Sequence, residues 1–476
     1  MSLKKDKGVV MNFVRKLMVL LSAVFLIIGL SSCEELLGKM LGEELYDASY
    51  PDVSVKDNEY DYSIHYGETL TLEVEASVDD DGTLSYQWYS NDKDKKDNAT
   101  AITGATKSTY TYTAPSEEIA AKYFWCKVTN KKGTKKAESW TYTITVSISN
   151  IIRLNGKTYE SAEEWDSTYT YYLEGWVYAK SSLVIPAGTV IKTGTNGYLY
   201  TDNAGTITAV GTEENPIIFT SYRDNSVGIT IPEFKGNSVK AAKGDWDGIE
   251  IKGTTGSKFE YCNFSYSNVF ALNLNNSADV KNCTFTYNKS EGRSGALHLN
   301  DRAGGSIVTN NTFYNNDWPL SCPNKYTVAT SNIFHNPDNE EIKNQKQAIV
   351  LDQGERIEDT TYWAITELPY FVTNGCVEVS GTLNIADNVI VKFAHESELG
   401  TSATGTISPG TTTIFTSYRD DAHGGDIEAD GQPTAPADGD WQGIYLYGSD
   451  KWGWDNELNK DTTRVLYNDT SKYTEN

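Results

Sequence analysis

The chain has 476 residues, of which 41 are Lys or Arg and 65 are Asp or Glu, so its formal net charge is -24. This length is typical of about three domains, and the excess of carboxylates, with no local basic cluster, excludes nucleic acid as a partner. Because 39% of the residues are apolar and Gly, Thr, Tyr, Val and Ile are abundant, we predict a folded protein that is mostly β.

Residues 1–33 have the pattern of a secretion signal, in which basic residues precede an apolar run from Met18 to Leu30. The run is too short to span a membrane comfortably as a permanent helix, and no later segment is apolar enough to cross a bilayer. Leu30-Ser31-Ser32-Cys33 resembles the lipobox of bacterial lipoproteins, which implies that Cys33 is diacylated and becomes the first residue after cleavage. We therefore predict a lipid anchor in the bacterial outer membrane or at the cell surface. The alternative is an ordinary signal peptide with an incidental cysteine.

Residues 34–49 are predicted to be a linker and residues 50–148 a β-sandwich, because short alternating runs are separated there by turn residues. Tyr86-Gln87-Trp88-Tyr89 and the strand around Cys126 resemble bacterial immunoglobulin-like domains. The resemblance implies that Trp88 is the core tryptophan of the third strand and that the domain is a spacer. No cysteine in residues 70–75 can pair with Cys126, so we expect Cys126 to be a small buried apolar residue.

The rest of the chain contains an internal repeat. The segment Phe219-Thr-Ser-Tyr-Arg-Asp224 returns as Phe415-Thr-Ser-Tyr-Arg-Asp420, and Gly244-Asp-Trp-Asp-Gly-Ile249 returns as Gly439-Asp-Trp-Gln-Gly-Ile444. The offsets are 196 and 195 residues. We predict two tandem units, residues 150–355 and a shortened second unit of residues 356–476.

A finer period inside the first unit predicts a solenoid. Phenylalanines recur every 21 to 28 residues, at Phe264, Phe285, Phe313 and Phe334, and aliphatic residues every 23 to 25 residues, at Ile249, Leu272, Leu297 and Leu320. Such series are typical of a parallel β-helix, in which each side chain stacks on its counterpart one coil away. The leucine-asparagine signature of leucine-rich repeats is missing. Cys262 and Cys283 occupy one such inward position, so we expect them to be stacked free thiols.

From about residue 165 onward the sequence resembles the right-handed parallel β-helix (pectin-lyase-like) modules of bacterial surface lipoproteins and adhesin-like proteins. The resemblance rests on Leu183-Val-Ile-Pro-Ala-Gly-Thr-Val-Ile-Lys192 and on the two repeated segments above. It implies a fold but no particular ligand. The predicted fold class is therefore all-β, an immunoglobulin-like β-sandwich followed by a right-handed parallel β-helix solenoid.

The loop before Trp441 contains a candidate calcium site. Asp426, Glu428 and Asp430, followed by Gly431, have the spacing of carboxylates that lets a loop wrap a hard cation. Related modules carry Asp-x-Asn-x-Asp-Gly here, so Glu428 departs from the pattern. A solvated acidic loop is the open alternative. A bound calcium ion would be structural.

Two other repeated features are expected to be structural. Arg223 and Arg419 recur next to an aspartate in both units, which favours Arg–Asp pairing between loop and coil. Trp246 and Trp441 recur in the Gly-Asp-Trp segments, which favours packing over sugar stacking.

The predicted ligand face is the outer side of the sheet that carries His298. His298 lies between the inward Leu297 and Leu299, so it points outward, beside Glu250, Asn273 and Ser321. This is the face on which β-helix lyases and glycosidases bind polysaccharide. Glu250, His298 and Asp301 are the nearest approach to a catalytic set, but the carboxylate clusters of pectate lyases and polygalacturonases are missing. We predict a ligand face of Glu250, Asn273, His298 and Asp301 and assign no catalytic residue.

The leading hypothesis is a membrane-anchored, surface-displayed, non-enzymatic lipoprotein that acts in adhesion or binds polysaccharide or a host surface glycoprotein. The alternative is a polysaccharide lyase or glycoside hydrolase that uses the outer face of the β-helix. A purely structural component of the cell envelope is the third hypothesis.

Overall fold

The structure is a computed structural model that describes residues 47–115, 121–234, 236, 238–352, 356–429, 431–448, 451–453 and 464–465. The predicted signal segment, Cys33, Asp430 and most of the predicted linker lie outside these residues. The described residues are strands joined by turns, loops and short 3-10 helices, so the all-β prediction is confirmed. They divide between Ser149 and Asn150 into two compact units. No described helix is long and apolar enough to cross a membrane.

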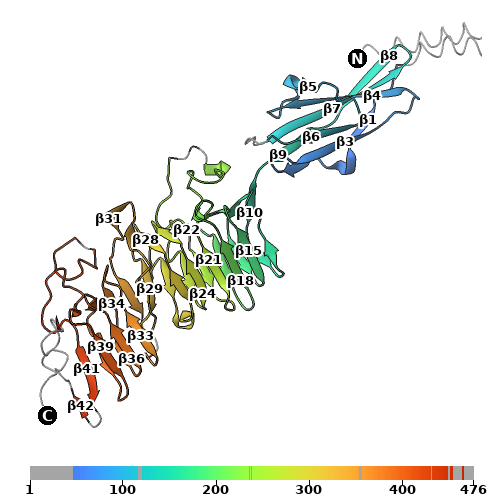
Figure 1. The fold of residues 1–476 in the computed structure, drawn as a ribbon. Helices are drawn as coiled ribbons and strands as arrows, with labels where there is room; N and C mark the ends of the chain where they lie inside the picture. Colours follow the sequence, from blue (N-terminus) through green and yellow to red (C-terminus); the bar gives the residue numbers. More distant parts are fainter. Residues whose placement is uncertain are drawn as a thin grey trace, which may run out of the picture. The chain divides into compact units, whose positions relative to one another are not determined.

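The first unit consists of two sheets (Figure 1). One contains β1 (Asp52–Val55), β3 (Thr69–Ser77) and β6 (Thr109–Thr113). The other contains β2 (Asp61–Ile64), β9 (Ile144–Ile148), β7 (Ala121–Lys132), β4 (Thr83–Asn91) and β5 (Thr100–Ala101), with β8 (Lys135–Trp140) paired to β7. Two 3-10 turns, η1 (Lys56–Asn58) and η2 (Lys96–Asn98), lie between strands.

Side chains from both sheets form one apolar core, which gives the predicted sandwich. Trp88 lies opposite Cys126 on β4 and β7, and both are fully buried. The indole nitrogen of Trp88 donates a hydrogen bond to the carbonyl of Lys107 at 3.0 Å. Cys126 is free, and burial raises its pKa to about 12, so it behaves as the predicted apolar residue.

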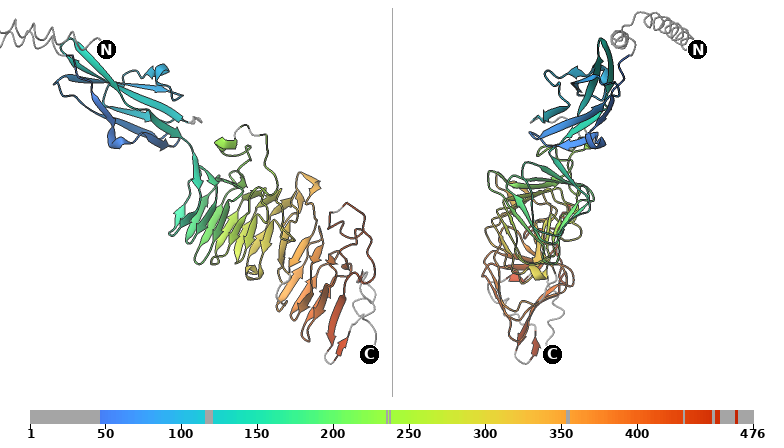
Figure 2. Two further views of the ribbon diagram at one scale, coloured as in Figure 1. Left: turned by 180° about the vertical axis from the view of Figure 1, so that it is seen from behind. Right: turned by 90° about the vertical axis from the view of Figure 1, so that its right-hand side faces the viewer.

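The second unit is a right-handed parallel β-helix whose coils contribute strands to parallel sheets (Figures 1 and 2). A 12-stranded sheet runs through it: β11 (Lys157–Tyr159), β14 (Trp176–Ala179), β17 (Tyr198–Thr201), β20 (Ile249–Ile251), β23 (Leu272–Leu274), β26 (Leu297–Leu299), β29 (Leu320–Pro323), β32 (Ile349–Asp352), β34 (Tyr370–Val372), β37 (Ile390–Phe393), β40 (Ile414–Ser417) and β43 (Arg464–Val465).

Two further sheets complete the first coils. A 7-stranded sheet holds β10 (Ile151–Leu154), β13 (Thr170–Leu173), β16 (Val190–Thr193), β19 (Ile217–Ser221), β22 (Cys262–Ser265), β25 (Thr284–Thr286) and β28 (Thr312–Tyr314). A 6-stranded sheet holds β12 (Glu163–Glu164), β15 (Ser182–Pro186), β18 (Thr206–Val210), β21 (Ser257–Glu260), β24 (Ala278–Lys281) and β27 (Ile307–Thr309). The short helices η3 (Pro232–Phe234) and η4 (Asp301–Ala303) lie in connecting loops.

The last coils pair the 12-stranded sheet with two smaller parallel groups. These are β33 (Thr360–Trp363), β36 (Thr382–Ile385) and β39 (Thr406–Pro409), and β35 (Cys376–Val379), β38 (Glu398–Thr401) and β41 (Gly443–Gly448), to which β42 (Lys451–Gly453) adds antiparallel. A hairpin of β30 (His335–Asn336) and β31 (Asn339–Lys343) forms a separate 2-stranded sheet.

The predicted columns of stacked side chains are present. Phe264, Phe285, Phe313 and Phe334 stack in order with ring centroids 4.8, 4.9 and 5.4 Å apart. Ile249, Leu272, Leu297 and Leu320 are in register on successive strands and fully buried. Cys262 and Cys283 are buried and free, as expected.

Buried asparagines form a second kind of column at the corner that follows the phenylalanines. The side-chain nitrogens of Asn288, Asn316 and Asn344 donate to the main-chain carbonyls of Phe264, Phe285 and Phe313 at 3.0, 2.8 and 2.9 Å. Each side-chain oxygen accepts hydrogen bonds from the residue one coil earlier, as in Asn288 to Asn316 at 2.9 Å and Asn316 to Asn344 at 2.9 Å. This asparagine ladder satisfies polar groups that the coil would otherwise bury unpaired.

The second sequence repeat is rotated by one face about the solenoid axis. Val190–Thr193 forms β16 of the 7-stranded sheet, whereas its counterpart Ile390–Phe393 forms β37 of the 12-stranded sheet. β19 and its counterpart β40 differ in the same way. The loops that follow, residues 222–248 and 418–442, therefore leave from different faces although their sequences are related.

Candidate functional site

The predicted outward row on the 12-stranded sheet is present. Glu250 is in register with Asn273, Asn273 with His298, and His298 with Ser321. We call these residues the polar row. Inward neighbours such as Leu297 and Leu299 are fully buried, so the alternation of β-strands directs the polar row outward.

Glu250 is the most connected member of the polar row. Its carboxylate pairs with Lys252 at 2.7 Å and accepts a hydrogen bond from the Asn275 amide at 2.7 Å. It also accepts a hydrogen bond from the Tyr198 hydroxyl, and burial together with this contact raises the pKa of Tyr198 above its usual value. Glu250 is thus held in one place by a strand, a lysine and an amide.

The amides continue this network along the sheet. Asn300 donates to the side-chain oxygens of Asn273 and Asn275, both at 2.8 Å. His298 bonds through Nδ1 to the Ser321 hydroxyl, and burial lowers the pKa of His298 below its usual value. A lowered pKa keeps the imidazole neutral at pH 7. The polar row therefore offers neutral donors and acceptors beside one paired carboxylate.

Asp301 does not join the polar row. It begins η4, and it is exposed on the loop beyond β26. Among the described interactions its side chain has no hydrogen bond or ion pair with Glu250, Asn273 or His298. The structure therefore brings Glu250, Asn273 and His298 onto one face and leaves Asp301 beside it.

Aromatic side chains precede the polar row on the same sheet, and the sequence analysis did not identify them. Trp176 is in register with Tyr198, and Tyr178 with Tyr200, on β14 and β17. We call these four residues the aromatic block. The rings of Tyr178 and Tyr200 stack at 4.6 Å, and Tyr200 is in register with Glu250. The signal for this block was the Trp-x-Tyr and Tyr-x-Tyr alternation, which places both aromatics of a strand on one face.

The outer face is covered at its C-terminal end. Val350 and Phe371 continue the register beyond Ser321. Both are buried in an apolar cluster with Trp318 and with Ile427 from the loop of residues 418–442. Ser321 is itself fully buried and Asn273 is only 7% exposed. The part of the face that a ligand can reach is therefore the aromatic block together with the partly exposed side chains of Glu250, Asn275, His298 and Asn300.

The candidate calcium loop is described in part. The Asp426 carboxylate accepts hydrogen bonds from the backbone N–H groups of Glu428, Ala429 and Gly431 at 2.9, 2.7 and 3.2 Å. Within the described part of the chain, no group of three or more His, Cys, Asp or Glu side chains is placed to hold a metal ion. Because Asp430 lies outside those residues, calcium binding by Asp426, Glu428 and Asp430 stays a prediction.

The repeated arginines pair with aspartates of the Gly-Asp-Trp segments and not with the neighbouring aspartates in sequence. Arg223 contacts Asp245 at 2.9 Å, and Asp245 also accepts a hydrogen bond from Ser221 at 2.6 Å. Arg419 and Asp440 repeat the pair at 3.9 Å. Trp246 and Trp441 are buried, as predicted for packing. These contacts fasten each long loop to its coil.

Two buried lysines recur beneath these loops. Lys192 donates to the carbonyl of Asp224 at 2.7 Å, and Lys392 to the carbonyls of Asp420 and Gly425 at 2.9 and 2.6 Å. Burial lowers the pKa of each lysine to about 8, although nearby carboxylates oppose the shift.

Stability is expected to depend on the protonation of Lys392. Since an unfolded lysine titrates near 10.4, the unfolded state binds more protons between about pH 8 and pH 10, and stability rises with pH in that window. Replacing Lys392 by Met removes this pH dependence. As pH rises from about 8 to about 10, the free energy of unfolding of wild type should therefore increase relative to that of the variant, by at most about 1.4 kcal/mol per pH unit. Denaturant titrations at several pH values measure the difference. The control is Lys258→Met, which replaces an exposed lysine, and its stability relative to wild type should be the same at every pH. If the stability of Lys392→Met relative to wild type also does not change with pH, the prediction is contradicted.

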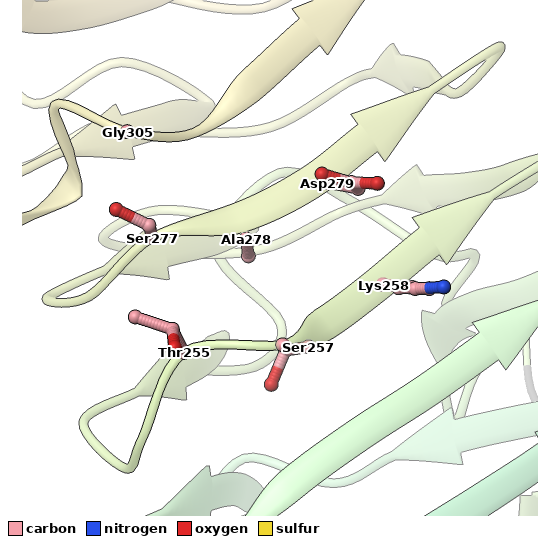
Figure 3. A pocket seen from close by; sticks show the side chains of 8 residues that line it. Thr255, Ser257, Lys258, Ser277, Ala278, Asp279 and Gly305 are labelled. Carbon is pink, nitrogen blue, oxygen red and sulfur yellow. The ribbon is translucent and has the colours of Figure 1, made fainter.

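One small surface pocket lies on another face (Figure 3). It has a volume of about 190 Å³ and is lined by Thr255, Ser257, Lys258, Ser277, Asp279 and their neighbours. Ser257 is already used to accept a hydrogen bond from the N–H of Ile207 at 3.1 Å. The pocket is smaller than the roughly 300 Å³ at which ligand sites begin, so we place the candidate site on the polar row.

Residues 156–298 match the family model described as "Pectate-lyase like beta helix domain". The chain contains a pectate-lyase-like β-helix domain. The matched part of this domain holds the aromatic block together with Glu250, Asn273 and His298. No curated protein matches the chain.

Solved structures similar to the chain include two pectate lyases and an exopolygalacturonase. The pectate lyase from Erwinia chrysanthemi in complex with tetragalacturonic acid is 9% identical, with 88% of this chain and 100% of that chain covered and a TM-score of 0.14. The pectate lyase from Pectobacterium carotovorum is 9% identical, with 88% of this chain and 100% of that chain covered and a TM-score of 0.14. The family 28 exopolygalacturonase from Yersinia enterocolitica is 11% identical, with 89% of this chain and 100% of that chain covered and a TM-score of 0.17. Values this low carry no argument about what the pectate-lyase-like domain does.

Proposed function

We propose that this protein is a non-enzymatic surface lipoprotein that binds carbohydrate through the outer face of its β-helix. The signal-like residues 1–33 support a lipid anchor at Cys33, in the bacterial outer membrane or at the cell surface. Trp88 and Cys126 in the core of the first unit support an immunoglobulin-like spacer. The ligand is a polysaccharide or the glycan of a host surface glycoprotein, and adhesion is the resulting role.

The observation that carries the proposal is the continuous outer face from Tyr200 through Glu250 and Asn273 to His298. Amides and hydroxyls held rigidly in register can bond successive hydroxyl groups of an extended glycan with little loss of side-chain entropy. Aromatic side chains beside them supply apolar contact area. Both kinds of contact are present on consecutive coils of one sheet.

Binding fits the geometry better than catalysis does. A general acid or base must be free to exchange a proton with the substrate, whereas Glu250 is paired with Lys252 and bonded to Asn275. Glu250 and His298 are also separated by the strand that carries Asn273. The alternative, a polysaccharide lyase or glycoside hydrolase, is supported by the pectate-lyase-like match over these residues.

The purified full chain is expected to be retained by at least one polysaccharide in a panel and to release no unsaturated or reducing-end products. Replacing the partly exposed Asn275 and Asn300 together by Ala should weaken retention by roughly tenfold or more, because two neutral hydrogen-bond sites are lost. Affinity electrophoresis measures retention, and absorbance and reducing-sugar assays measure products.

Asn339→Ala serves as the control, because Asn339 is exposed on the β30–β31 hairpin and outside the face. Products that wild type forms and Glu250→Gln does not would overturn the non-enzymatic proposal in favour of the enzyme. If the double asparagine variant is retained as strongly as the Asn339→Ala control and wild type, the ligand does not bind to this face.

A further inference from the structure

The charge of the outer face limits the class of glycan that it can bind, which the proposed function leaves open. Two basic side chains, Lys180 and Lys252, lie beside the aromatic block and Glu250, and both are paired, with Glu160 at 2.7 Å and with Glu250 at 2.7 Å. Their ammonium groups also lie over the rings of Tyr178 and Tyr200, at 5.3 and 5.9 Å from the ring centroids. At the covered C-terminal end, Arg293 lies over the Phe371 ring at 5.1 Å and donates to the carbonyl of Thr373.

Acidic groups outnumber these two lysines. Asp202 is next to the aromatic block, where its carboxylate is 3.4 Å from the Tyr178 hydroxyl, and Asp247 acts electrostatically on Tyr198. Together with Glu160 and Glu250, the local balance is negative, as is the net charge of -24 on the whole chain. A polyanion would approach against this field and would meet cations that are already paired.

Trp176 supplies the apolar part of the site. Its side chain is 45% exposed, whereas most tryptophans in the described part of the chain are buried or nearly so. A Cβ built on Gly156 would lie 3.5 Å from Cζ2 of Trp176, so the indole rests beside a residue that has no side chain. An exposed indole supported in this way can stack against the C–H face of a sugar ring.

The hydrogen-bonding groups that follow are uncharged. The Asn300 amide donates to the side-chain oxygens of Asn273 and Asn275, both at 2.8 Å. Asn273 is buried, but the partly exposed amides of Asn275 and Asn300 keep further hydrogen-bonding positions for a ligand. Such groups suit hydroxyls, each of which both donates and accepts. A carboxylate only accepts, and it would lie close to the carboxylate of Glu250.

We infer that the outer face binds an uncharged glycan, stacked on Trp176 and hydrogen-bonded to Asn275 and Asn300, and that it discriminates against uronate polymers. This inference rests on the proposed function, and it narrows the substrate class.

Matched pairs of polymers test the inference on the purified full chain. Each pair is an acidic polysaccharide, such as polygalacturonate, alginate or hyaluronate, and its carboxyl-reduced form, which keeps the same linkages without the charge. We expect a reduced member to be retained at least about tenfold more tightly than its acidic parent. Its retention should be equal at about 50 and about 500 mM NaCl, because no ion pair is involved.

Trp176→Ala is expected to weaken retention of the reduced polymer by about tenfold. Tyr362→Ala is the matched control, since Tyr362 is 51% exposed on β33, outside the 12-stranded sheet. Tighter and salt-sensitive retention of the acidic members would overturn the inference while leaving carbohydrate binding in place. Retention of no member of any pair, and of no neutral polysaccharide in the wider panel, would overturn the proposed function itself.

Discussion

Replacing Phe285 by Ala is expected to lower the free energy of unfolding of the β-helix by about 3–5 kcal/mol. Phe285 is fully buried and stacks between Phe264 and Phe313, with ring centroids 4.8 and 4.9 Å away and ring planes within 10°. Its removal forfeits the burial of an aromatic ring and two stacking contacts, and it leaves a cavity in the middle of the column. Urea or guanidinium titration of the full chain measures the change.

The matched control for this prediction is Tyr287→Ala. Tyr287 is two residues along the same coil, stacks on Tyr266 alone in the described rings and is 44% exposed. Its removal should cost less than about 1 kcal/mol, as is usual for surface side chains. Equal losses for the two variants would show that the phenylalanine column does not hold the coils together.

The columns could be predicted from sequence because stacking repeats a local choice. When the same inward position recurs once per coil, the residue that fits one coil fits the next, so phenylalanine recurs at residues 264, 285 and 313 although the coils differ in length. The polar row followed from the same argument, since the residue between two inward leucines must point outward. His298 and its neighbours were placed in this way without any contact being known.

Other features could not be read from the repeat because they depend on where chain segments meet across coils. The partner of Arg223 is Asp245, which is 22 residues away in sequence and belongs to a different motif. The rotation of the second repeat shows only in the sheet to which each repeated strand belongs, as with β16 and its counterpart β37. This rotation places the loop with Ile427 on the same sheet as the polar row and closes its C-terminal end.

The buried asparagines could likewise be predicted from the sequence only in part. Asn311 and Asn332 take the inward position of Cys283 in the next coils, and Asn311 accepts a hydrogen bond from the N–H of Cys283 at 2.9 Å. Asn288, Asn316 and Asn344 form a separate ladder that the spacing did not reveal, because asparagine is also common in exposed turns. Burial distinguishes the two cases, and burial follows from the closed coil.

Removing one rung of this ladder is expected to be costly. Asn316 donates to the carbonyl of Phe285 at 2.8 Å and to the side-chain oxygen of Asn344 at 2.9 Å, and its own oxygen accepts from the backbone and side chain of Asn288 at 3.1 and 2.9 Å. Asn316→Ala removes these four hydrogen bonds, although the Asn344 oxygen keeps its bond from the backbone N–H of residue 316 and the Asn288 amide keeps its bond to Phe264. Each buried group left unsatisfied costs about 1–3 kcal/mol. We expect a total loss of at least about 3 kcal/mol in denaturant titrations, against less than about 1 kcal/mol for Asn339→Ala in the exposed hairpin.

Asn316→Asp distinguishes lost hydrogen bonds from lost packing, because it keeps the shape and removes the donor. An aspartate buried at this position would have a raised pKa, since burial and the facing carbonyl of Phe285 disfavour its charged form. The folded state would then bind a proton more tightly than the unfolded state, so the variant should lose stability as pH rises from about 4 to about 7. At low pH the protonated carboxyl can donate to that carbonyl, and the deficit relative to wild type should shrink. A deficit that does not change with pH would mean that the ladder acts through packing and not through its hydrogen bonds.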